Sequence, residues 1–339
     1  MKTIFSLLFL FLAFTFSVAA QEWRKDFDDG LSLMSQRKYA EAAEKFNKVN
    51  TVKNDIPQVY YNLGVCYENQ KMHKESINAF KEAVRLKSDY FAAFVQLGNE
   101  LDYDERYDEA VVAYQSAINL QPNESQPYFE LGVAHKGKNK YSLAEPMFRK
   151  SIQLSPKYAP AHLQLAVTLQ SLNRPSEVIP ELKTAIKLAG ENPEYHRQLG
   201  VAYTSLKRYP DAIAEYQETL RLNPKSYEAY YGLGIVYFNQ NLYAEAAANY
   251  LKTLELVPNW ANANAYLADC YRLTQRTSDS MTYYRKALVL DSQNTSGLYG
   301  LGLLYVNLKN KVMARQQYDL LKPLDAALAA KLLGVINAK

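Results

Sequence analysis

The chain has 339 residues, a net charge of +4 at pH 7 and apolar residues at 48% of its positions. This length suits two ordinary domains or one long array of repeats, and a chain of this composition is expected to fold. Because lysine and arginine form no dense block, we do not expect a nucleic-acid-binding protein.

The first predicted element is an apolar segment from Ile4 to about Phe16, which follows the single charge of Lys2. Residues 17–20 then read Ser-Val-Ala-Ala, with small residues where a signal peptidase reads. We therefore predict a secretory signal in residues 1–20 that is cleaved after Ala20. The mature protein would be exported, to a bacterial periplasm or outside the cell. The open alternative is an uncleaved anchor helix, although the apolar run is slightly short for a span of about 20 residues.

From residue 23 onward the sequence repeats with a period of 34 residues. Glycine or alanine recurs at this step, and leucine precedes it in every case except the first. The recurring small residues are Gly30, Gly64, Gly98, Gly132, Ala166, Gly200, Gly234, Ala268 and Gly302. A fixed period of this length is typical of stacked helical repeats. We divide the chain into nine units, 23–56, 57–90, 91–124, 125–158, 159–192, 193–226, 227–260, 261–294 and 295–328.

Two units show the internal pattern clearly. Residues 227–260 carry Tyr230, Leu233, Gly234, Tyr237, Ala246, Tyr250 and Pro258. Residues 91–124 carry Phe94, Leu97, Gly98, Ala110, Tyr114, Ala117 and Pro122 at matching places. In these residues the chain resembles the tetratricopeptide repeat family. The resemblance implies an all-α fold, a right-handed superhelical solenoid of nine helix-turn-helix repeats.

Each unit is expected to hold two helices. Repeat positions 4, 7, 8 and 11 share one face of a first helix, and positions 20, 24 and 27 share one face of a second. Small residues let the helices approach, and large ones fill the space between them. Pro146 and Pro180 both stand at position 22, where we expect the second helix to be kinked or loosened. A closing helix over residues 324–337, with Leu324, Leu328 and Leu332 on one face, is predicted to cover the last repeat.

No arrangement of residues in the sequence indicates catalysis or a metal site. The four histidines, His73, His135, His162 and His196, all fall at packing positions. Cys66 and Cys270 lie six repeats apart, too far for an intrachain disulfide in a solenoid. The glycine pairs at 232–234 and 300–302 lie inside a first helix rather than between a strand and a helix, so they are no phosphate loop. We therefore predict a protein that is not an enzyme and needs no cofactor.

The resemblance places the first helices along a concave groove, to which repeat positions 2, 5, 6, 9, 12 and 13 contribute. Position 6 carries mostly amides, namely Asn62, Gln96, Glu130, Gln164 and Gln198. Position 9 adds an aliphatic strip that includes Val133, Val167 and Val201. An amide can donate and accept hydrogen bonds together. This row therefore suits the backbone of an extended peptide.

The C-terminal half of the predicted groove is more apolar. It presents Tyr231, Ile235, Phe238, Asn239, Tyr299, Leu303 and Val306. Exposed apolar patches often mark partner sites, but the closing helix or a superhelical neighbour could instead cover this one. Both alternatives stay open. Gly232, at position 6 of its unit, is interpreted as free of any packing requirement.

The predicted function is a non-enzymatic, exported scaffold for protein–protein interaction. It would bind an extended peptide or a partner helix in its groove, within a cell-envelope assembly. Two alternatives remain open, a repeat module that docks a catalytic partner such as a glycosyltransferase or protease, and a membrane-tethered scaffold. The expected partner is a protein or peptide, with no nucleic acid, and a membrane is involved only if residues 1–20 are retained.

Overall fold

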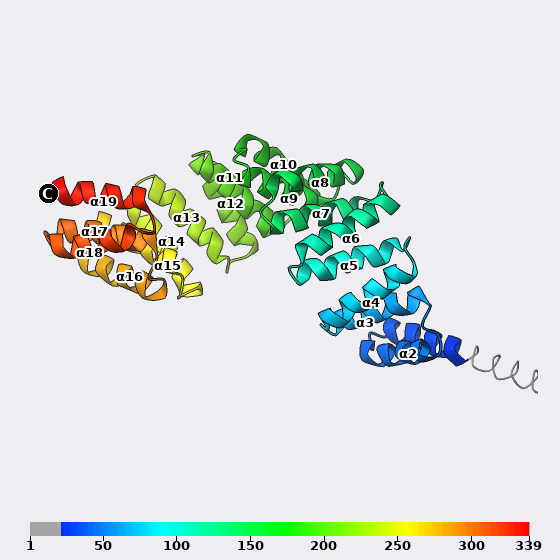
Figure 1. Ribbon diagram of the computed structural model, residues 1–339. Coiled ribbons are helices and arrows are strands. Elements are labelled where there is room, and N and C mark those ends of the chain that lie inside the picture. The colour runs from blue at the N-terminus through cyan, green and yellow to red at the C-terminus, as the bar shows by residue number, and fades with distance from the viewer. Residues whose placement is uncertain (1–21, 339) are drawn as a thin grey trace, which may run out of the picture. The chain divides into compact units, whose positions relative to one another are not determined.

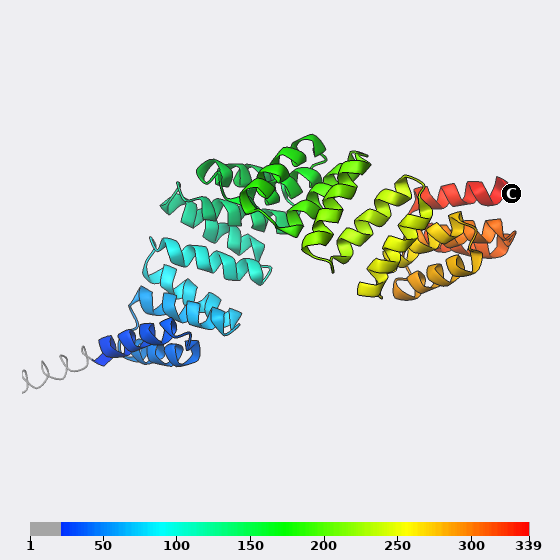
Figure 2. The ribbon, with the colours of Figure 1, turned by 180° about the vertical axis from the view of Figure 1, so that it is seen from behind.

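The computed structural model describes residues 22–338, so the predicted secretory signal in residues 1–20 lies outside the described residues. Within residues 22–338 the chain is helical and has no strand. Residues 22–35 are helical, and α2 to α19 follow (Figures 1 and 2). Their bounds are α2 Tyr39–Val52, α3 Pro57–Asn69, α4 His73–Leu86, α5 Phe91–Tyr103, α6 Tyr107–Leu120, α7 Ser125–Gly137, α8 Tyr141–Leu154, α9 Ala159–Ser171, α10 Pro175–Ala189, α11 Pro193–Ser205, α12 Tyr209–Leu222, α13 Tyr227–Asn239, α14 Tyr243–Leu256, α15 Ala261–Leu273, α16 Thr277–Leu290, α17 Thr295–Asn307, α18 Lys311–Leu321 and α19 Ala326–Ala338.

The chain falls into two compact units, unit 1 (Met1–Leu172) and unit 2 (Asn173–Lys339). Within each unit, consecutive helices pack as hairpins, such as α3 on α4 and α13 on α14. From Pro57 onward a helix begins at repeat positions 1 and 17 of every period. The all-α fold built from tetratricopeptide-type hairpins is thus confirmed in both units.

The turn inside each repeat is built on a left-handed residue at position 15. Nine non-glycine residues of the described chain have φ between 55° and 63°, namely Arg37, Lys71, Glu105, Asn139, Asn173, Lys207, Asn241, Gln275 and Lys309. The next N–H then reaches back to the carbonyl five residues earlier, as Met72 N does to Tyr67 O at 2.9 Å. This bond satisfies a carbonyl that the end of a helix would leave unpaired. It therefore ends the first helix of each repeat at the same position.

Within a repeat, the small residue at position 8 lets the two helices approach. A Cβ atom on Gly64 would lie 2.5 Å from the Phe80 ring, and one on Gly234 would lie 2.5 Å from the Tyr250 ring. Phe80 and Tyr250 stand at position 24 of the second helix and are fully buried. The aromatic side chain thus fills the space left by the missing side chain of the glycine. This is the packing that the recurring small and large residues predict.

The two interior prolines do not end their helices. Pro146 lies inside α8 and Pro180 inside α10, and both helices continue for two turns or more beyond them. Each proline still removes one backbone N–H from its helix. We therefore expect the two prolines to lower the stability of their helices and not to shorten them.

Replacing Pro146 with alanine should stabilise unit 1. The exposed side chain contributes little packing, while alanine restores the N–H that α8 lacks at this turn, so we expect a gain of about 1–3 kcal/mol. Urea unfolding followed by far-UV circular dichroism measures it. Pro160 is the matched control, because it stands in the first turn of α9, where an N–H has no helical partner. No gain for Pro146→Ala, or an equal gain for Pro160→Ala, would refute the argument.

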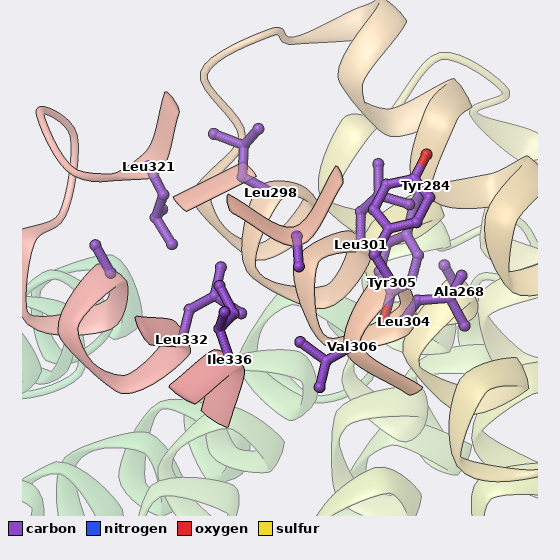
Figure 3. Close-up of a cluster of buried hydrophobic side chains, with 12 residues drawn as sticks. Ala268, Tyr284, Leu298, Leu301, Leu304, Tyr305, Val306, Leu321, Leu332 and Ile336 are labelled. Atoms are coloured by element: carbon purple, nitrogen blue, oxygen red, sulfur yellow. The ribbon is translucent and has the colours of Figure 1, made fainter. Parts of the chain in front are cut away.

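The closing helix is α19 (Ala326–Ala338), and it packs against α17 and α18. Its Leu332 and Ile336 join one buried cluster with Leu301 and Val306 of α17 (Figure 3). A Cβ on Gly302 would lie 2.6 Å from Leu332 Cδ2, so in the last repeat a residue of α19 fills the space beside the position-8 glycine. Leu324 was predicted to lie on this seam. It lies in the turn at residues 322–324 that precedes the helix, and it is 39% exposed.

Candidate functional site

The first helices of unit 1 present one continuous row of half-buried side chains. In unit 1, α5 contacts α7 and α7 contacts α9, so their faces adjoin. We define the unit-1 face by repeat positions 6, 9 and 12 of α3, α5, α7 and α9. Its members are Asn62, Val65, Glu68, Gln96, Asn99, Asp102, Glu130, Val133, Lys136, Gln164, Val167 and Gln170, and each is half-buried. These side chains are held by neighbours and still reach the surface.

Hydrogen bonds within the protein fix the amides of this face. The Tyr114 hydroxyl donates to Asn99 Oδ1 at 2.9 Å, and Asn99 Nδ2 donates to Gln96 Oε1 at 3.1 Å. The Lys136 ammonium donates to Gln164 Oε1. Gln96 also interacts with the hydroxyl of Tyr61. The two glutamines thus use their carbonyl oxygens internally and Gln96 also donates to Tyr61, which leaves the amide N–H groups of Gln164 and one N–H of Gln96 as donors for a bound carbonyl.

The carboxylates of the unit-1 face are poorly compensated. Glu68, Asp102 and Glu130 form no salt bridge within residues 22–338. Burial, with the nearby charge of Asp102, raises the pKa of Glu130 to about 7. Burial likewise raises the pKa values of Asp102 and Glu68 and lowers that of Lys136. The Oδ1 atom of Asp102 is enclosed and has no hydrogen-bond partner.

Charged residues on the first helices of unit 2 form ion pairs with one another. Glu194 binds Arg197 at 2.6 Å and also accepts from Gln198 Nε2 at 2.8 Å, so this amide is engaged internally. Asp269 binds Arg272 at 2.8 Å and accepts from the Tyr284 hydroxyl at 2.6 Å. Gln198 therefore belongs to a different electrostatic setting from the amides of unit 1. Val201 beside it is half-buried.

The aromatic residues predicted for the groove in unit 2 are largely packed against one another. The rings of Tyr231 and Trp260 lie 4.4 Å apart, and Tyr231 and Phe238 both contact Tyr266 of the next repeat. Ile235 packs on the same buried cluster. Asn239, by contrast, is exposed. Tyr231, Ile235 and Phe238 are half-buried and do not form a free apolar patch.

The interpretation of Gly232 as free of packing is wrong. Gly232 is buried, and a Cβ there would lie 2.4 Å from Tyr216 Cζ of the preceding repeat. Gly300 has the same relation to Tyr284, at 2.4 Å. In these two repeats the tyrosine at position 24 extends beneath the next first helix, into the space that a side chain at position 6 would occupy. Glycine is thus required at these two places by the residue sixteen positions earlier.

In the last repeat, the closing helix covers the first-helix face. Val306 is only 3% exposed and shares a buried cluster with Leu332 and Ile336 of α19 (Figure 3). Tyr299 and Leu303 pack against the same cluster and are half-buried. The sequence left open whether this apolar segment is a partner site or is covered by the closing helix. For Val306 the closing helix covers it.

Two of the four histidines pair with glutamates, and both cysteines are buried. Nδ1 of His73 lies 3.1 Å from Glu100, and Nδ1 of His196 lies 2.7 Å from Glu215. Cys66 and Cys270 are buried free thiols, and burial raises their pKa values to about 11 and about 12. Across residues 22–338 no three His, Cys, Asp or Glu side chains come together to bind a metal. In the same range, no helix combines the length and apolarity needed to span a bilayer.

Family models match much of the chain. A model described as TPR repeat matches residues 104–139 and 202–241. Three models described as tetratricopeptide repeat match residues 57–90, 135–199 and 231–296. No curated protein sequence matched the chain.

Solved structures share the fold at low sequence identity. The APC/C hetero-tetramer Cut9-Hcn1 aligns over 92% of this chain and 75% of that chain, with a TM-score of 0.61 and 14% identity. A tetratricopeptide repeat protein from Parabacteroides merdae covers 73% of this chain and 98% of its own, with a TM-score of 0.61 and 15% identity. Pseudomonas aeruginosa pilF covers 62% and 96%, with a TM-score of 0.55 and 22% identity. At such identities the likeness establishes the fold alone.

Proposed function

The chain belongs to the tetratricopeptide repeat family, whose repeats form protein–protein interaction scaffolds, and we propose that it binds an extended peptide of a partner protein along its first helices. The observation that carries this proposal is the half-buried amide row of unit 1, Asn62, Gln96 and Gln164. Their amide oxygens are in part held by neighbouring side chains, and their N–H groups can donate to peptide carbonyls.

Preorganisation supports binding at this face. The packed aromatic and glycine pairs hold the first helices of unit 1 in fixed register, and Asn99 and Lys136 orient the glutamine amides. Because these side chains are already ordered, binding loses little conformational entropy on the scaffold side. An extended peptide offers carbonyls at regular spacing and could use several of the amides at once.

Export is a further part of the proposal, and it rests on the sequence of residues 1–20. The scaffold would act in a bacterial periplasm or outside the cell, within an envelope assembly. Amino-terminal sequencing of the protein purified from its native cells tests this directly. A mature chain that begins at Gln21 supports export with cleavage, whereas a chain that begins at Met1 contradicts it.

Substituting Asn62, Gln96 and Gln164 together with alanine should reduce partner capture. Each lost hydrogen bond is worth about 0.5–1.5 kcal/mol, so a loss of roughly tenfold or more is expected. The readout is a pull-down from envelope extract, quantified by mass spectrometry. The matched control removes Gln115 and Gln153, exposed amides on the second helices α6 and α8. Unchanged capture by the folded triple variant, or an equal loss in the control, would eliminate the amide row as the binding surface.

A further inference from the structure

The unit-1 face carries an excess of negative charge. At positions 6, 9 and 12 of α3, α5, α7 and α9 it presents Glu68, Asp102 and Glu130 against the single cation Lys136. The chain as a whole has the opposite sign, +4 at pH 7. The acidity of this face is therefore local and does not follow from the composition.

Several acidic residues elsewhere in the described chain form ion pairs within the protein. On the first helices of unit 2, Glu194 and Asp269 bind arginines at 2.6 and 2.8 Å. On the second helices of unit 1, Glu109 binds Lys81 at 2.9 Å and Asp108 binds Lys138. The carboxylates of the unit-1 face differ from these residues because they are half-buried and form no salt bridge in the described chain.

Lys136 supplies only part of the missing counter-charge, because its positive charge lowers the pKa of Asp102 by less than burial raises it. Its ammonium donates to Gln164 and forms no salt bridge in the described chain, while the enclosed Oδ1 of Asp102 has no hydrogen-bond donor. Half-buried carboxylates without a cation are costly, because they lose hydration without gaining an ion pair. A bound cation would offset this cost and would draw the pKa of Glu130 down from about 7.

We infer that the unit-1 face selects partner segments that carry lysine or arginine, with the cationic side chains on Asp102 and Glu130 and the backbone on the amide row. This inference rests on the proposed function and adds the charge of the ligand. Charge complementarity supports it, since the face offers three carboxylates beside three amides that hydrogen bonds hold in place, Gln96, Asn99 and Gln164. A guanidinium or ammonium donates several hydrogen bonds and can satisfy a carboxylate and an amide oxygen together.

Fluorescent peptides of alternating alanine and lysine, alanine and glutamine, or alanine and glutamate test the inference by anisotropy on the full chain. The buffer is held at about pH 8, above the pKa of Glu130 of about 7, so that its carboxylate is charged. We expect the lysine peptide to bind roughly tenfold or more tightly than the glutamine peptide, and the glutamate peptide to bind least. The variant Glu68→Gln, Asp102→Asn, Glu130→Gln should lose this preference.

The matched control is Glu41→Gln, Glu44→Gln, Glu75→Gln, which changes the net charge equally at exposed sites on α2 and α4. It should keep the full preference for the lysine peptide. Equal losses in both triple variants would mean diffuse attraction to the surface and would overturn the inference. Equal binding of the lysine and glutamine peptides, or no binding of either, would overturn it as well.

Folding and the proposed function are separated by two further readouts. Circular dichroism checks that the acidic-face variant folds, and the single variant Glu130→Gln, which is expected to keep the fold and lose part of the preference, provides an independent test. The amide substitutions report on backbone binding whatever the charge of the ligand. If they reduce partner capture while the peptide preference is absent, the groove function stands and the cation preference falls.

Discussion

Replacing Gly234 with valine is expected to destabilise unit 2 by about 3 kcal/mol or more. A Cβ at this position would lie 2.5 Å from Cε1 and 2.7 Å from Cδ1 of Tyr250, and that ring is fully buried. The ring has no free volume to move into, because the rings of Tyr231 and Tyr266 pack beside it, with centroid separations of 5.7 and 5.8 Å. The valine must therefore push α13 and α14 apart. Chemical denaturation followed by circular dichroism measures the loss.

The control is the same substitution at Gly334. This glycine lies in α19 and is exposed, and a Cβ there would meet no atom within 4 Å beyond the adjacent backbone of its own helix. Valine there should be neutral or slightly stabilising, since glycine is the poorer helix former by a few tenths of a kcal/mol. If both variants lose the same stability, close packing against the Tyr250 ring is not the cause of the loss at position 8. Alanine is already present at position 8 in Ala166 and Ala268, which sets the size that the interface tolerates.

The packing of the repeats could be predicted from the sequence because it is periodic. Gly64 and Phe80, or Gly234 and Tyr250, stand sixteen residues apart in each unit and meet in the structure. The left-handed residue at position 15 is equally regular in the backbone. It varies from Arg37 to Asn241 in the sequence, because the turn needs a conformation rather than a side chain. A constraint of that kind leaves little trace in one sequence.

The surface residues were less predictable, because their role depends on a neighbour in the next repeat. The sequence pattern leaves Gly232 without a packing role, but in the structure it lies against Tyr216. The pattern places Val306 on the groove, but α19 covers it. The absence of salt bridges at Asp102 and Glu130 likewise depends on which side chains become neighbours in the folded chain. Glutamate and lysine are frequent in the chain, and only the structure shows which of them meet.

The two units consequently offer different surfaces from the same repeat. In unit 2 the first-helix face is occupied by aromatic contacts and by internal ion pairs such as Asp269 with Arg272. In unit 1 the equivalent face keeps amide donors and uncompensated carboxylates. Satisfied polar groups gain little from a ligand, while unsatisfied ones gain a great deal. This difference directs the search for the binding site to unit 1.

Leu332→Asp is expected to release the closing helix and expose the last repeat. Leu332 is fully buried against Gly302, and an aspartate there would lose that packing and place a charge in an apolar cluster. The combined cost is about 4 kcal/mol or more, enough to detach α19 from α17 and α18. Hydrogen exchange measured by mass spectrometry should then show faster exchange in α17 and α19.

The control Leu324→Asp should leave exchange unchanged, because Leu324 is 39% exposed and precedes α19. The same comparison tests whether α19 acts as a lid on an apolar face. Release should expose Tyr299, Leu303 and Val306, so the Leu332→Asp variant should bind an apolar dye or self-associate, and the control should not. If α17 stays protected in Leu332→Asp, then α16 and α18 suffice to hold it. The closing helix would in that case be an attachment to the last repeat rather than the element that completes its core.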